Sequence, residues 1–241
     1  MSKIYDALKR AERERETVRD TARETWAPAA ERRGLTNGAE QEEYQRLRAS
    51  LLLAPGPAST HTILVTATRH GEGATRVAIG LATALAAERD SRVLLAEANL
   101  RSPSLANRLH FNSTPGLCDF FAGRIQAEDL VTRMSDSNLS VIHAGSKAAV
   151  VDCEAIASVV TRLGPQFDFI VVDAPPVNQD ADVAVLAPKM DGVVLVVEAD
   201  RTPVAEAETA KRSLDRVGAR LFGVVLNRQR SYVPAFIQAL L

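Results

Sequence analysis

Short runs of apolar residues alternate with helical patterns along most of the chain. The apolar runs are rich in valine and isoleucine and cover residues 62–67, 92–96, 139–143, 167–173, 192–197 and 221–226. The clearest helical patterns between them cover residues 75–88, 153–163 and 203–217. Continuous apolar strands that alternate with helices indicate a mostly parallel sheet with helices on both faces. The pattern therefore predicts an α/β fold whose ligands bind at the carboxyl ends of the strands.

The beginning of the chain follows a different pattern. Residues 1–16 predict a short amphipathic helix, whose apolar face would carry Ile4, Ala7, Leu8 and Ala11. Residues 17–39 combine charge, glycine and proline with little periodicity, which is typical of a linker. A second helix is expected from about residue 40 to residue 53. We therefore expect an N-terminal helix and linker over residues 1–39 and one main domain over residues 40–241.

Composition narrows the classes of function. Hydrophobic residues make up 46% of the chain and charged residues 24%, which are ordinary values for a soluble globular protein. Twenty-nine basic residues nearly balance thirty acidic ones, so the charge balance favours neither nucleic acid nor an anionic membrane as a partner. Cys118 and Cys153 lack metal-ligand spacing and form no disulfide framework, which fits a reducing cytosol. No apolar run approaches the ~20 residues of a spanning helix.

A glycine-rich turn follows the first predicted strand. Residues 70–75 read His-Gly-Glu-Gly-Ala-Thr, and a helical pattern begins at once. Strand, glycine loop and helix in this order form the context of a phosphate-binding loop, in which backbone N–H groups and the helix dipole favour an anion. A tight turn without any ligand would give the same pattern, so this segment leaves both interpretations open.

Four further motifs follow in a fixed order. Residues 94–103 read Leu-Leu-Ala-Glu-Ala-Asn-Leu-Arg-Ser-Pro and residues 116–123 read Gly-Leu-Cys-Asp-Phe-Phe-Ala-Gly. Residues 168–176 read Asp-Phe-Ile-Val-Val-Asp-Ala-Pro-Pro and residues 223–227 read Gly-Val-Val-Leu-Asn. From about residue 40 to residue 227 the chain resembles the cytoplasmic domain of the bacterial tyrosine kinases of polysaccharide assembly, relatives of the MinD/ParA-type P-loop ATPases. The resemblance implies a P-loop NTPase-like fold with ATP or ADP and Mg²⁺ as ligands.

Three positions depart from that family's pattern. The family has lysine at the position of Ala74 and aspartates at the positions of Glu97 and Asn99, and only Asp173 among the acidic positions is unchanged. Phosphoryl transfer depends on charge neutralisation by such groups, and removing one commonly costs about 10²–10³ in rate. We therefore expect no catalytic residue and a weakened site for ATP or ADP. The degenerate site would comprise Gly71, Glu72, Gly73, Ala74, Thr75, Arg76, Glu97, Asn99, Asp173 and Asn227.

The metal ligands, the self-association helix and the C-terminal tyrosines of the family are also only partly present in this chain. No metal is expected, although Thr75 and Asp173 would be its ligands if Mg²⁺ binds. Relatives self-associate through a Glu-x-x-Arg-x-x-Arg helix, and this chain has Glu42, Gln45 and Arg48 at those places. With the central arginine missing, ring assembly is not favoured, but a homo-oligomer stays open. Relatives also carry a C-terminal tyrosine cluster, whereas Tyr232 stands alone near the end of this chain.

Three functions fit these features. The first is a non-catalytic relative of the tyrosine kinases, a pseudokinase, that acts in exopolysaccharide or capsule biosynthesis and export. It would be cytoplasmic and would reach the inner membrane through a membrane polysaccharide co-polymerase, a chain-length regulator. The second is an active tyrosine autokinase with altered nucleotide ligands, and the third is a MinD/ParA-like positioning ATPase. No nucleic-acid partner and no membrane span of its own are expected for the first.

Overall fold

A seven-stranded sheet forms the centre of the molecule. The structure is a computed structural model that describes residues 38–53, 61–111, 115–126, 129–135, 137–145 and 152–229. The strand order is β3-β4-β2-β5-β1-β6-β7. The strands are β1 (His61–Ala67), β2 (Val93–Glu97), β3 (Thr132–Arg133), β4 (Leu139–Ile142), β5 (Phe169–Asp173), β6 (Gly192–Glu198) and β7 (Leu221–Asn227).

All neighbouring strands pair in parallel except β3, which pairs antiparallel with β4. The six strands expected from the sequence are therefore confirmed, with their ends shifted by at most two residues. Strand β3 was not predicted, because it has only two residues and a run of that length carries no periodicity.

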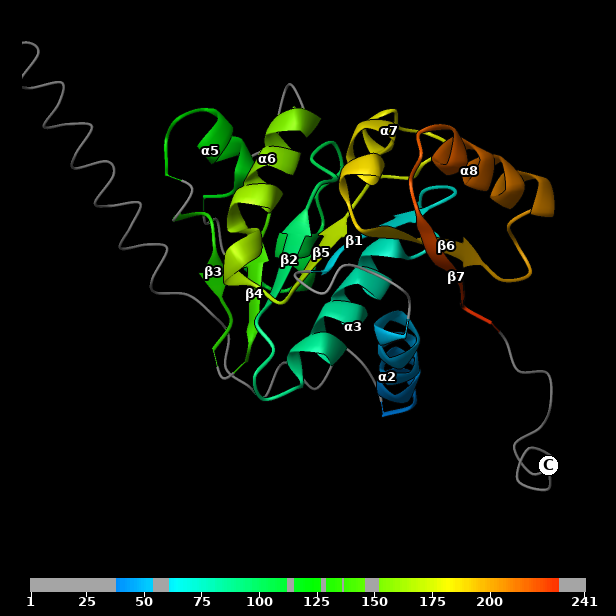
Figure 1. The fold of residues 1–241 in the computed structure, drawn as a ribbon, viewed down its shortest axis with the longest axis horizontal. Helices are drawn as coiled ribbons and strands as arrows, with labels where there is room; N and C mark the ends of the chain where they lie inside the picture. The colour runs from blue at the N-terminus through cyan, green and yellow to red at the C-terminus, as the bar shows by residue number, and fades with distance from the viewer. Residues whose placement is uncertain are drawn as a thin grey trace, which may run out of the picture.

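Helices cover both faces of the sheet. Figure 1 shows α6, α7 and α8 on one side of it and α3 and α2 on the other. The helices are α2 (Gly38–Leu52), α3 (Ala74–Ala86), α4 (Leu105–Arg108), α5 (Leu117–Phe121), α6 (Cys153–Leu163), α7 (Asp182–Leu186) and α8 (Val204–Arg216), with short 3₁₀ turns η3 (Gly164–Gln166) and η4 (Ala187–Lys189). This arrangement confirms the α/β fold class with a mostly parallel central sheet and helices on both faces.

Alternate residues of the central strands enter separate cores on the two faces of the sheet. In β1, Leu64 packs among residues of α5, α6 and α7, whereas Ile63 and Val65 pack against α3. The alternation follows from the two-residue period of a strand, and both faces are apolar because both are covered. This double burial explains why the strands read as unbroken apolar runs in the sequence.

Helix α2 packs onto α3, and one of its contacts depends on a glycine. A Cβ atom at Gly80 of α3 would lie 2.2 Å from the ring of Tyr44, so only glycine allows the ring to lie there. The Tyr44 hydroxyl also donates to the carbonyl of Arg76 at 3.3 Å. Helix α2 begins at Gly38, two residues before the predicted start. The predicted helix over residues 1–16 lies outside the described residues, so the division at residue 39 stays a prediction.

Candidate nucleotide-binding site

Three strands end side by side at the carboxyl edge of the sheet, where a ligand was expected. β5 lies between β1 and β2, so the residues at the ends of these three strands are neighbours. The parallel register places Asp173 at the end of β5 opposite Val65 of β1 and opposite Glu97 of β2. Two carboxylates therefore share one edge beside the glycine loop that leaves β1.

The loop between β1 and α3 has the backbone shape that its glycines allow. Gly71 and Gly73 both adopt left-handed conformations, with φ of 87° and 96°. A Cβ atom at Gly73 would lie 2.2 Å from Nδ2 of Asn227, so a side chain is excluded there for a second reason. Helix α3 begins at Ala74, and the N–H groups of its first turn have no intrahelical acceptor. These N–H groups at the mouth of the loop are suited to an anion.

Glu72 holds the loop from the inside. Its side chain is 2% exposed, and its carboxylate accepts hydrogen bonds from the backbone N–H of Thr68 at 2.8 Å and of Arg69 at 3.1 Å. The hydroxyls of Thr68 and Thr202 also donate to it. Thr202 lies between β6 and α8, so Glu72 ties the loop to the far side of the site. Its carboxylate is fully engaged in this structural role.

Asn227 holds the loop from outside. Its Nδ2 donates to the carbonyl oxygen of Glu72 at 2.7 Å, and its own carbonyl accepts from the N–H of Ala199 at 2.9 Å. In relatives of the kinases that this chain resembles, the asparagine at this position lies near the adenine, so the resemblance predicts a contact of Asn227 with a base. In this structure its amide nitrogen is used to brace the loop, so a contact with a base stays a prediction.

Asp173 is the exception among the buried polar groups at this edge. Its side chain is 1% exposed, and neither carboxylate oxygen has a hydrogen-bond partner among the described residues. Burial, with a smaller contribution from the charge of Glu97, raises the pKa of Asp173 to about 7, although the nearby Thr75 hydroxyl and Arg108 oppose the rise. A buried carboxylate without a partner is costly, so this group takes up either a proton or a cation.

Glu97 lies opposite Asp173 and is satisfied. One of its oxygens accepts from the backbone N–H of Leu105, at the start of α4, at 2.8 Å, and from the N–H of Ser104. The other accepts from the N–H of Ala144 after β4 at 2.9 Å. Burial raises the pKa of Glu97, and these three backbone hydrogen bonds oppose that rise. This carboxylate therefore holds α4 and β4 together.

Asn99 also makes a local contact. The side-chain Oδ1 of Asn99 accepts from the backbone N–H of Ser102 at 3.2 Å. The backbone N–H of Asn99 donates to the backbone carbonyl of Asp173 at 3.2 Å. The amide thus closes the turn that follows β2. The side chains at positions 97 and 99, where the family has aspartates, are both hydrogen-bonded to the backbone around them.

The arginines nearest the loop in sequence are engaged with acidic partners. Arg76 pairs with Glu40 of α2 at 2.5 Å. Arg69 pairs with Glu206 of α8 at 3.1 Å and donates to the carbonyl of Arg201 at 3.2 Å. Ala74 itself brings only a methyl group to the place where the family has lysine. Neither arginine therefore substitutes for the missing ammonium group in this conformation.

The residues present fit a magnesium ion only in part. Thr75 offers a hydroxyl 3.4 Å from that of Ser104, and Asp173 offers two oxygens without partners. These oxygen atoms are of the type that Mg²⁺ prefers, and Mg²⁺ usually keeps several waters. No group of three or more His, Cys, Asp or Glu side chains gathers as a metal site within the described residues. Thr75 and Asp173 would hold the ion, and the nucleotide phosphates would have to complete its shell.

The three interface candidates of α2 show contacts within the chain. Glu42 pairs with Arg46 at 2.8 Å, and Arg48 pairs with Glu88, two residues after the end of α3. Gln45 is half-buried. Arg48 is thus used to dock α2 on its own domain, and a role for these residues between subunits stays a prediction.

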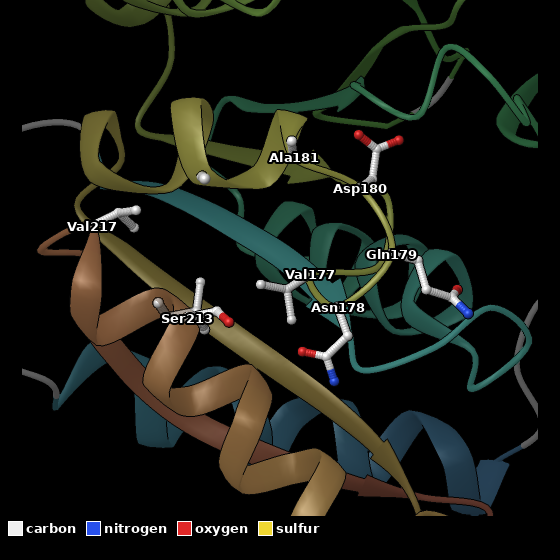
Figure 2. A pocket seen from close by; sticks show the side chains of 9 residues that line it. Val177, Asn178, Gln179, Asp180, Ala181, Ser213 and Val217 are labelled. Carbon is white, nitrogen blue, oxygen red and sulfur yellow. The ribbon is translucent and has the colours of Figure 1, made fainter.

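A pocket of about 340 Å³ lies beside the loop, between the segment after β5, α7 and α8. Figure 2 shows Val177 and Ser213 facing one another across it, while Gln179 and Asp180 extend away from them. Oε1 of Gln179 accepts from the backbone N–H of His70 at 3.0 Å, and Asp180 pairs with Arg101 at 3.2 Å. The pocket wall therefore touches the glycine loop. Sequence patterns gave no signal for this pocket, because α7 is a five-residue helix.

Comparison with known proteins agrees with this geometry. A sequence profile of the ParA family, described as an NUBPL iron-transfer P-loop NTPase, matches residues 58–237. The chain belongs to the ParA family of P-loop NTPases. It is 25% identical over 193 residues to the tyrosine-protein kinase YwqD of Bacillus subtilis, with 78% of this chain and 81% of that protein covered. It is 26% identical over 179 residues to the tyrosine-protein kinase CpsD of Streptococcus agalactiae, with 72% of this chain and 78% of that protein covered.

Solved structures show the same relationship. The crystal structure of the chimerical protein CapA2B2 matches with a TM-score of 0.72 and 25% identity, covering 79% of this chain and 85% of that one. MinD of Pyrococcus horikoshii, solved as a complex with Mg-ADP, matches with a TM-score of 0.63 and 22% identity, covering 74% and 75%. The second likeness concerns the fold alone. The resemblance to bacterial tyrosine kinases and to the MinD/ParA group is thus confirmed.

We expect Asp173→Asn to stabilise the protein at high pH. The ordinary pKa of this carboxyl is 3.8 and its folded value is about 7. Between these values the folded state keeps a proton that the unfolded chain has lost, so the raised pKa favours folding at low pH and this contribution disappears as the pH rises through about 7. Asparagine carries no charge. Its advantage in unfolding free energy should grow from pH 4 to pH 7 and reach at most about 4 kcal/mol above it.

Urea unfolding of both proteins at pH 4.5, 6 and 8 measures this difference. Because Glu97 contributes to both curves, only the difference between the variant and the wild type reports Asp173. A difference that stays constant over this range would show that Asp173 is an ordinary ionised carboxylate.

Glu97→Gln should have the opposite effect. A glutamine has one acceptor oxygen and an NH₂ group that would face a backbone N–H, so a buried donor loses its partner. We expect a loss of roughly 2–3 kcal/mol of unfolding free energy at pH 7. Glu42→Gln is the control, since Glu42 lies in an exposed ion pair whose loss should cost at most about 0.5 kcal/mol. Equal, small effects of both substitutions in urea unfolding would exclude a bracing role for Glu97.

Proposed function

We propose that the chain is a non-catalytic or weakly active relative of the bacterial tyrosine kinases that keeps the shape of a nucleotide site without its transfer chemistry. The single observation that carries this proposal is that no described side chain of the loop itself, residues 68–76, offers a cation without an acidic partner. Ala74 has no charge, and Arg76 and Arg69 are paired with Glu40 and Glu206. Charge that develops on a transferred phosphoryl group would remain uncompensated by side chains of the loop.

The acidic groups support the same proposal. In a working site two or more carboxylates would face the metal, whereas Glu97 and Asn99 are hydrogen-bonded to the neighbouring backbone. Among the buried carboxylates described at this edge, Asp173 is the one whose oxygens have no hydrogen-bond partner. With one carboxylate and the Thr75 hydroxyl, Mg²⁺ binding would depend on the phosphates of ATP or ADP. We therefore expect a weakened nucleotide site in which the Mg²⁺ chemistry of phosphoryl transfer is not supported.

The loop nonetheless keeps its conformation by its own contacts. Glu72 and Asn227 fix it through hydrogen bonds that involve neither a lysine nor a metal. A domain whose loop is braced in this way can present a fixed surface to another protein whether or not a nucleotide is bound. This property suits a partner protein better than an enzyme that cycles between states.

The partner we propose is a membrane polysaccharide co-polymerase that regulates chain length in exopolysaccharide or capsule biosynthesis. Its basis is the resemblance to the tyrosine kinases of polysaccharide assembly. No helix in the described part of the chain is long and apolar enough to cross a membrane. In this proposal the chain is cytoplasmic, peripheral to the inner membrane through this partner, and free of nucleic acid.

A complementation experiment tests whether catalysis is needed. A strain lacking this chain should show a reduced amount or altered length of its exopolysaccharide, and the wild-type gene should restore both. We expect Thr75→Ala and Asp173→Asn to restore them equally well, because each removes a ligand for Mg²⁺ and leaves the bracing contacts of the loop in place.

Protein abundance must be equal in all strains for this comparison. If either variant is folded and abundant but leaves the polymer defect uncorrected, the site works chemically and the non-catalytic role is wrong. If deletion of the chain has no effect on any exopolysaccharide, the proposed pathway is wrong.

A further inference from the structure

Strand β7 leaves an apolar surface uncovered at the edge of the sheet. Val224 and Leu226 are 52% and 60% exposed, which is high for a sheet whose other parallel strands are mostly buried. They lie opposite Leu195 and Val197 of β6, so the four side chains belong to one face. On that face α8 covers the β6 pair through Ala210 and Ala207. The helical layer thus ends one strand before the sheet does.

The strand itself carries no feature that protects an edge. Residues 221–227 contain no charged residue and no proline, although such residues commonly shield exposed edge strands. An edge strand of seven uncharged residues with exposed apolar side chains favours association with another segment or chain. A covering element is therefore to be expected, and it needs an apolar stripe about as long as the exposed part of β7.

The chain bends directly after this strand. Arg228 has a left-handed backbone conformation, with φ of 58°, and its N–H donates to Oδ1 of Asn227 at 2.9 Å. Its guanidinium pairs with Glu198 at the end of β6 at 3.1 Å. A non-glycine residue in this conformation ends a strand and changes the direction of the chain. The backbone at Arg228 therefore turns off the line of β7.

The sequence after the bend has the required stripe. In residues 230–241, which lie outside the described part, apolar side chains recur at helical spacing, namely at Val233, Phe236, Ile237, Leu240 and Leu241. Pro234 is suited to the first turn of a helix. Eight residues from Pro234 would span about 12 Å as a helix. The exposed part of β7, from Gly223 to Asn227, spans about 13 Å.

We propose that residues 234–241 form a helix that packs on Val224 and Leu226 of the same chain, beside α8. A second copy of the chain or a membrane surface could also cover Val224 and Leu226. A helix of eight residues is marginal by itself, so it needs a surface at high local concentration, which a tether of a few residues provides. Membrane-surface helices are rich in Lys and Arg, whereas Arg230 is the one charged residue in 230–241.

A double-mutant cycle on the full chain tests the contact. Leu226→Ser and Phe236→Ser should each lower the melting temperature by about 3–6 °C, and the double variant should lose little more than the larger single effect. Gln238→Ser, off the apolar stripe, is the control and should change nothing. If Leu226 were exposed to solvent, replacing it would hardly change the melting temperature. An unchanged melting temperature of Leu226→Ser therefore overturns the proposal. Additive effects of Leu226→Ser and Phe236→Ser in the double variant overturn it as well.

Two further measurements separate the other occupants. Sedimentation should give the same mass for the wild type and for Phe236→Ser, with melting independent of protein concentration. A dimer that Phe236→Ser dissociates would replace the proposal with contact between two copies. Co-sedimentation with phosphatidylglycerol vesicles should be absent, and binding that Phe236→Ser abolishes would assign the stripe to a lipid surface instead.

Discussion

The parallel pairing of β2, β5 and β1 forces Glu97 and Asp173 to share one buried edge of the sheet. Two carboxylates at such a place cannot both carry an uncompensated charge. The two carboxylates differ in their hydrogen bonds: Glu97 accepts three from backbone N–H groups, whereas Asp173 accepts none from described residues. One acidic group therefore holds α4 and β4 together, and the other is left with a pKa of about 7 and an affinity for a proton or a cation.

The shape of the glycine loop and its chemistry are separable in this chain. Shape comes from Gly71 and Gly73, from the buried Glu72 and from the amide of Asn227. Chemistry in a phosphoryl-transfer site comes from a lysine and from metal-binding carboxylates, and here those positions hold alanine and hydrogen-bonded side chains. In the proposed function, this ParA-family domain retains a stable loop without the groups that stabilise a transferring phosphoryl group. This separation underlies the proposed role as a partner protein.

The sequence predicted the fold well because its strands are buried on both faces and read as unbroken apolar runs. It also predicted which residues meet at the carboxyl edge, since Gly73, Glu97, Asp173 and Asn227 stand at loop and strand ends. It could not predict their hydrogen bonds. The three N–H groups bound by Glu97 come from α4 and from the end of β4, far apart along the chain. The helices α4, α5 and α7 were missed because four or five residues show no helical period.

A phosphate-transfer assay tests the central claim most directly. The purified full chain, incubated with Mg²⁺ and ATP labelled at the γ-phosphate, should leave the label on the nucleotide. Release no faster than in buffer, and no label on the protein, would agree with a loop that has lost its cation. Label on Tyr232 or another tyrosine of the chain, or rapid release of labelled phosphate, would contradict the account if Asp173→Asn abolishes it.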